Sequence, residues 1–186
     1  LVPHGLEANA VKSVVTDLMQ EAAQSLVQLV GAKAYRINHI AGRGTVDSRP
    51  FQIFEGSNDI LYAQISEGLI KLMKRAKESN LYQFLKNHDL SEKAADYLKE
   101  MTNFNINFQM PQRKLVEMGR VMGRIISMNQ LLDLAEKGFR KDLIDGGITM
   151  LQQDIYRLIA NFSFNNKTEV IEGYNENSSW LSFVKA

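Results

Sequence analysis

The chain contains no cysteine, which excludes disulfide bonds and thiolate chemistry and is compatible with a reducing compartment. Its three prolines fall outside the strongly periodic segments, as is typical of an all-helical chain. No apolar run approaches the roughly 20 residues that span a bilayer. The formal charge of +1 gives no general attraction to nucleic acid or to an anionic membrane. We therefore expect a cytoplasmic protein without a membrane span or a nucleic-acid partner.

The 186 residues are enough for one domain with a proper core. The first residues, 1–5, have neither the basic region nor the apolar region of a signal peptide. Because the chain does not begin with methionine, we expect it to be a piece of a longer protein.

Apolar residues recur at helical spacing in the first part of the chain and predict two helices. The first helix ends at Gly31, a natural stop signal. From Gly31 to Pro50 the pattern dissolves, which predicts a long and functional connection. The second helix begins near Asn58, and a soft boundary follows at Ser79. The first stripe consists of Val11, Val14, Val15, Leu18, Ala22, Leu26 and Leu29, and the second of Leu61, Ile65, Leu69, Leu72 and Met73.

The second half predicts three further helices, over residues 89–101, 111–137 and 148–160. Residues 103–108 alternate like a strand, but their asparagines favour a loop. Gly119 and Gly123, one turn apart, should let another helix approach closely. Beyond Asn161 the chain is either a loop or a strap held down by aromatic residues such as Trp180. The predicted fold is an all-α, antiparallel helical bundle.

The most informative stretch runs from Gln52 to Asp59 and places Glu55 directly before a glycine, between two helical segments. Ser57 is a good N-cap for the following helix, and Gly56 allows a sharp turn and the close approach of a ligand. A carboxylate held on a turn can abstract a proton. The alternative is an ordinary acidic residue favoured by the helix dipole.

Two motifs in this region resemble the C-terminal segment of the acyl-CoA dehydrogenase family. They are the glutamine and glycine turn at residues 28–35 and the Asp-Ser-Arg-Pro-Phe-Gln-Ile-Phe-Glu-Gly-Ser run at 47–57. The resemblance covers roughly residues 8–73. It implies that residues 1–79 are the second half of the family's C-terminal helical bundle, and that residues 80–186 are a C-terminal helical extension of the kind longer members carry.

The resemblance implies that Glu55 is the catalytic base, which removes the α-proton of an acyl-CoA thioester while FAD accepts a hydride from the β-carbon. It assigns cofactor contacts to Gln28 and Gly31, across a subunit interface, and to Gly56 and Ser57. It also implies an electron-transfer acceptor and a homo-oligomer. This chain alone should be inactive, because the family's other domains complete the site.

The chain departs from the family pattern at several positions. Ala32 and Ala34 replace glycines of the turn, Val46 replaces an arginine, and Asp59 adds a negative charge near the cofactor. Arg43 or Arg49 could substitute for the missing arginine. The two alanines and the missing arginine favour an alternative, a non-catalytic helical module for interaction or oligomerisation. The three histidines lie in separate segments without ligand spacing, so we expect no metal site.

Overall fold

The computed structural model describes residues 3–36 and 38–163. The first part of the chain forms helix α1 (Pro3–Val30), the short 3₁₀ helix η1 (Gly31–Tyr35), α2 (Ile40–Ser48), η2 (Arg49–Gln52) and α3 (Asn58–Ala76). The second part forms α4 (Leu81–Lys86), α5 (Glu92–Ala95), η3 (Asp96–Leu98), α6 (Lys99–Thr102), α7 (Gln112–Glu136) and α8 (Lys141–Ser163). The predicted all-helical class is confirmed for these residues.

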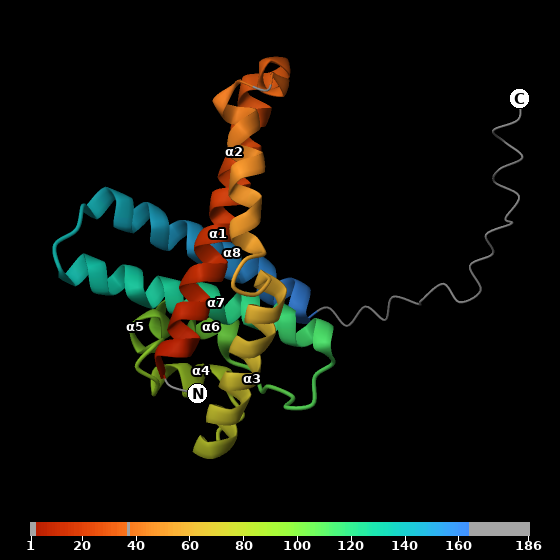
Figure 1. The fold of residues 1–186 in the computed structure, drawn as a ribbon. Coiled ribbons are helices and arrows are strands. Elements are labelled where there is room, and N and C mark those ends of the chain that lie inside the picture. Colours follow the sequence, from red (N-terminus) through yellow and green to blue (C-terminus); the bar gives the residue numbers. More distant parts are fainter. Residues whose placement is uncertain (1–2, 37, 164–186) are drawn as a thin grey trace, which may run out of the picture.

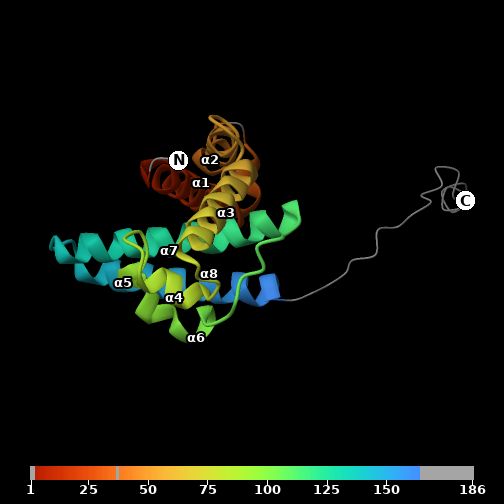
Figure 2. The ribbon, with the colours of Figure 1, turned by 90° about the horizontal axis from the view of Figure 1, so that it is seen from below.

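The long helices form two crossing pairs (Figures 1 and 2). In the first pair α1 runs antiparallel to the α2–α3 segment, and in the second α7 runs antiparallel to α8. The α7 helix packs against both α1 and α3 and so joins the two pairs. The short helices α4 to α6 lie beside α7 and α8, and the far end of α1 projects from the molecule together with α2 (Figure 1).

One apolar core lies where the two pairs cross. Its largest fully buried side chains include Tyr62 and Ile65 of α3 and Met118 and Ile125 of α7. Gly119 allows this crossing, because a Cβ atom there would lie 1.9 Å from the carbonyl oxygen of Tyr62. The expected close approach at Gly119 and Gly123 is therefore confirmed. The core takes residues from both sides of Ser79, and the division into residues 1–79 and 80–186 stays a prediction.

Several element predictions are confirmed. Helix α1 ends before Gly31, which has φ of 69°. Helix α3 begins at Asn58, residues 103–108 carry only an isolated bridge between Asn80 and Asn105, and α7 spans most of the predicted 111–137.

Other predictions are wrong. Residues 31–50 are mostly helical, because α2 packs along the end of α1. The predicted helix 89–101 consists of three short pieces, α8 begins at Lys141 rather than Ile148, and α4 was not predicted. The first apolar stripe is only partly buried: Val14 is 1 % exposed but Leu29 is 86 % exposed, because α1 extends beyond the core.

Residues 162 and 163 of the predicted tail belong to α8, and the rest of it, including Trp180, lies outside the described residues. Within the described ranges, no helix combines the length and the apolar character needed to cross a membrane.

Candidate active site

Glu55 lies on a tight turn between η2 and α3. Its backbone is left-handed, with φ of 58°, and that of Gly56 has φ of 101°. A left-handed conformation disfavours any residue with a Cβ atom, by about 1 kcal/mol or more. In residues 3–36 and 38–163, Lys77 is the other non-glycine residue with this geometry. The Glu55 side chain is exposed and forms no hydrogen bond or ion pair with another described residue.

Lys12 of α1 contacts the turn that carries Glu55. Its ammonium group donates hydrogen bonds to the carbonyl oxygen of Gly56 at 2.9 Å and to Oδ1 of Asn58 at 2.8 Å. Partial burial lowers the pKa of Lys12, against the opposing effect of the carboxylates of Glu55 and Asp17. The positive charge of Lys12 therefore lies next to the turn that carries Glu55.

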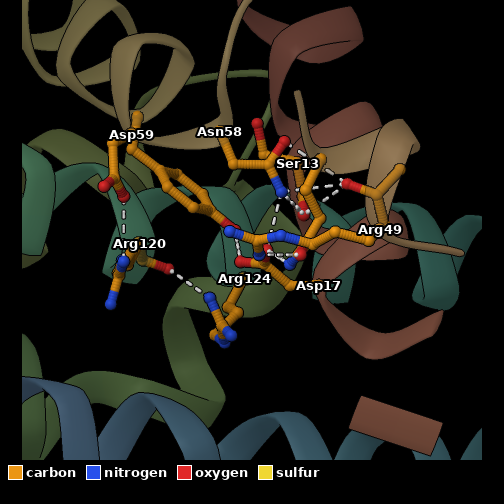
Figure 3. Close-up of polar contacts among 10 residues, drawn as sticks. Ser13, Asp17, Arg49, Asn58, Asp59, Arg120 and Arg124 are labelled. Atoms are coloured by element: carbon orange, nitrogen blue, oxygen red, sulfur yellow. Dashed lines mark hydrogen bonds and ion pairs between the residues drawn. The ribbon is translucent and has the colours of Figure 1, made fainter. Parts of the chain in front are cut away.

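Asn58, the first residue of α3, is buried and ties the turn to α1. Its amide nitrogen lies within hydrogen-bond distance of the Ser13 carbonyl oxygen (3.1 Å), the Thr16 hydroxyl (2.9 Å) and Oδ1 of Asp17 (2.6 Å) (Figure 3). Because these acceptors lie on successive turns of α1, Asn58 fixes where α3 begins.

Asp17 collects contacts from both sides of the turn. Its Oδ1 atom accepts a hydrogen bond from the Gln52 amide at 2.7 Å, and its Oδ2 atom accepts one from the Tyr62 hydroxyl at 2.7 Å. Arg49 donates to Oε1 of Gln52 at 2.6 Å. The segment before Glu55 and the helix after it are thus both anchored to one carboxylate on α1.

Ser57 occupies the N-cap position of α3, as the sequence predicted, but its side chain forms no capping hydrogen bond. The expected capping by its hydroxyl is therefore wrong. The polar contacts are made one residue later, by Asn58. Sequence reasoning missed Asn58, Lys12, Asp17 and Tyr62, because their partners lie more than forty residues away.

The structure does not bring Gln28 and Gly31 to Glu55. Gln28 follows Asp17 on α1, and the rise of an α-helix places it roughly 16 Å further along the helix axis. Both Gln28 and Gly31 are exposed. Gly56 and Ser57, by contrast, adjoin Glu55. The five predicted site residues therefore form two separate groups.

A groove of about 520 Å³ lies beside the glycine turn, at the projecting end of α1 and α2. Its lining residues are Val27, Ala34, Tyr35, Arg36, Gly42, Arg43, Thr45, Val46 and Asp47. Ala32 and Ala34 do not have positive φ, so replacing the family's glycines introduces no backbone strain here. Gly42 permits the close packing of α2, because a Cβ there would lie 2.2 Å from the Ala34 carbonyl oxygen.

Two of the three histidines have structural roles. Nδ1 of His39 accepts a hydrogen bond from the Ala41 amide at the start of α2, and Nδ1 of His88 accepts one from the Leu90 amide. The part of the chain that the structure describes holds no group of metal-binding side chains.

Residues 2–70 match the family described as acyl-CoA dehydrogenase, C-terminal domain. The matched segment, which is less than half of the chain, is similar to the C-terminal domain of acyl-CoA dehydrogenases. No curated protein and no solved structure matches the chain. The acyl-CoA dehydrogenase segment contains Lys12, Asp17, Glu55 and Tyr62 and ends within α3, so α7 and α8 lie beyond it.

Proposed function

We propose that the chain is the C-terminal part of a flavin-dependent acyl-CoA dehydrogenase in which Glu55 is the catalytic base. One observation carries the proposal. In the segment that matches the family, Glu55 is an exposed carboxylate, without a partner among the described residues, on a turn anchored at both ends. Such a group is free to meet a substrate and cannot drift far from its position.

In this proposal the Glu55 carboxylate takes the α-proton of an acyl-CoA thioester. FAD, when bound, accepts the hydride from the β-carbon. The thioester displaces water from Glu55 and thereby increases the basicity of the carboxylate. The anchoring by Lys12, Asn58 and Gln52 keeps the carboxylate within reach of the proton, which is the geometric requirement for general base catalysis.

The groove at the far end of α1 has features that suit one edge of FAD. Arg36 and Arg43 supply positive charge for a diphosphate, and Gly31 lets a backbone approach closely. Gln28 is exposed and directly follows Val27, which lines the groove. Because this end lies far from Glu55, we propose that Gln28 and Gly31 contact the flavin of a neighbouring subunit, whereas Gly56 and Ser57 contact the one in the same site.

Exposed apolar side chains at the same end support a homo-oligomer. Leu29, Tyr35, Ile40 and Val46 are between 71 % and 89 % exposed, and a cluster of large apolar residues on the surface is typical of an interaction site. The proposal further includes a cytoplasmic location, an electron-transfer acceptor, and residues 80–186 as a C-terminal extension. The chain alone should not catalyse the reaction.

The test is Glu55→Gln in the complete protein, with Glu67→Gln, an exposed glutamate of α3, as the matched control. The amide keeps the size of the side chain but removes the base. Acyl-CoA oxidation should fall by about three orders of magnitude or more, while flavin content and acyl-CoA binding remain. The control should be fully active. Undiminished turnover by Glu55→Gln would refute the assignment.

The apolar surface at the α1–α2 end also fits the alternative function, a helical interaction or oligomerisation module without chemistry. The absorption spectrum of the complete protein separates the two. A yellow protein that binds acyl-CoA supports the enzyme, and a colourless, well-folded protein that does not bind acyl-CoA supports the module.

A further inference from the structure

Tyr62 connects the Glu55 turn to the rest of the molecule. Its side chain is fully buried, and its hydroxyl donates to Oδ2 of Asp17. The other oxygen of Asp17 accepts hydrogen bonds from Gln52 and Asn58, which flank Glu55. A single carboxylate therefore joins Tyr62 to both ends of the turn.

The opposite side of Tyr62 faces α7. Burial and the Asp17 carboxylate raise the pKa of Tyr62, and the guanidinium of Arg124 acts against them. Arg124 is 8 % exposed, and its Nε atom donates to Oδ2 of Asp154 on α8 at 2.9 Å. Tyr62 thus hydrogen-bonds to Asp17 of α1, and Arg124, whose charge acts on Tyr62, pairs with Asp154 of α8.

Two further contacts seat α7 on the first turns of α3. Gly119 places the α7 backbone directly against the Tyr62 carbonyl group. Arg120 lies over the Tyr62 ring, with 5.8 Å between its Cζ atom and the ring centroid, and pairs with Asp59 at 2.9 Å (Figure 3). Because packed interiors deform little, the position of α7 determines the position of the start of α3.

We infer that the α7–α8 pair, which lies beyond the family segment, is a positioning element for the Glu55 turn and acts through the Tyr62 hydroxyl. This inference rests on the proposed function. Without the hydroxyl, Oδ2 of Asp17 loses its donor, and the carboxylate that anchors Gln52 and Asn58 is free to turn. A displacement of the base by about 1 Å can cost about a hundredfold in rate.

The experiment compares Tyr62→Phe with Tyr156→Phe in the complete flavoprotein. Tyr156 is a tyrosine of α8 that is 65 % exposed, so its variant is the matched control. We expect Tyr62→Phe to lower kcat by about tenfold to a hundredfold, with little change in KM. We also expect a larger kinetic isotope effect with α-deuterated thioester, because proton abstraction becomes slower relative to the other steps.

A second readout does not depend on activity. Amide hydrogen exchange in residues 53–61 should accelerate by about tenfold in Tyr62→Phe and not in the control. If Tyr62→Phe does not fold, Asp154→Asn decides, because it keeps the shape of the side chain while removing the charge opposite Arg124. It should show the same three changes to a smaller degree.

The outcomes separate this inference from the proposed function. Unchanged kcat, isotope effect and exchange in the folded variant would overturn the positioning role even if Glu55→Gln is inactive. A loss of thermal stability alone, with an unchanged isotope effect and unchanged exchange in residues 53–61, would also overturn it. If Glu55→Gln remains active, the proposed chemistry fails, and the exchange measurement still decides whether α7 and α8 hold the turn.

Discussion

At the scale of single residues, Asn58 has the densest set of contacts around the candidate base. It accepts from Lys12 and donates toward Ser13, Thr16 and Asp17, all on α1. Its amide nitrogen lies 2.6 Å from Oδ1 of Asp17, a contact that only a donor can make. The chemistry of this one side chain therefore decides whether the turn and α1 attract or repel each other.

Asn58→Asp should destabilise the protein more than the small change in structure suggests. The new carboxylate has the same shape but cannot donate, and it faces the charge of Asp17 in a buried place. We expect a loss of about 2–4 kcal/mol in the free energy of unfolding, measured by urea denaturation. Asn87→Asp, at an exposed position, is the control and should change stability by less than about 0.5 kcal/mol. Equal effects of the two substitutions would contradict the role of Asn58.

His88 should make stability depend on pH. Burial lowers the pKa of His88 from its usual 6.5, against the opposing effect of Asp89. Below pH 6.5 His88 takes up a proton in the unfolded chain, whereas His88 in the folded chain stays neutral down to a lower pH. The contribution of neutral, buried His88 to stability is therefore complete above pH 6.5 and is lost as the pH falls through the pKa of the folded state. Thermal unfolding at pH 7.5 and pH 5 should show a smaller drop for His88→Gln than for the unaltered protein. An identical drop in both would show that other groups cause the dependence.

At the scale of helices, some glycines of this chain end a helix and others lie inside one. Gly42 and Gly44 look like helix breakers in the sequence, yet both lie within α2. Gly42 is required there because α2 approaches the Ala34 carbonyl too closely for a Cβ atom. Sequence periodicity describes an isolated helix, whereas this requirement arises only when two segments meet, so the helix was missed.

Gly119→Ala and Gly146→Ala form a matched pair that tests the crossing of α7 and α3. Both glycines lie within helices, but a Cβ at Gly119 would lie 1.9 Å from the Tyr62 carbonyl oxygen, and a Cβ at Gly146 would meet no atom within 4 Å. Gly119→Ala should lower the free energy of unfolding by about 2–4 kcal/mol.

Gly146→Ala should instead raise stability by up to about 1 kcal/mol, because alanine is the better helix former. Urea denaturation measures both variants. Stabilisation by both substitutions would mean that α7 does not lie against α3 as the structure has it.

At the scale of the whole molecule, the sequence predicted more of the elements than of the site. Helices α1, α3 and α7 follow from their apolar spacing, and the end of α1 follows from the stop signal at Gly31. The turn at Glu55 follows from its glycine. The anchoring of that turn could not be predicted, since Lys12, Asp17 and Tyr62 meet only after α1 and α3 pack together.

The same packing explains why the two groups of predicted site residues are separate. Helix α1 is long enough to carry the anchor of the Glu55 turn near its middle and the Gln28–Gly31 turn at its far end. Two separate groups of proposed contact residues on one helix fit the proposal that the cofactor lies between neighbouring subunits. This arrangement supports the proposed assembly, which the oligomeric state of the complete protein would test.

The most direct test of the central claim measures proton abstraction without the following hydride transfer. A thioester with no hydrogen on its β-carbon can exchange its α-hydrogens with solvent but cannot be oxidised. In D₂O, the complete protein should introduce deuterium at the α-carbon of such a bound thioester, and so should Glu67→Gln. Glu55→Gln should bind the thioester without exchange. Exchange by Glu55→Gln at the rate of the unaltered protein would contradict the assignment of Glu55 as the base.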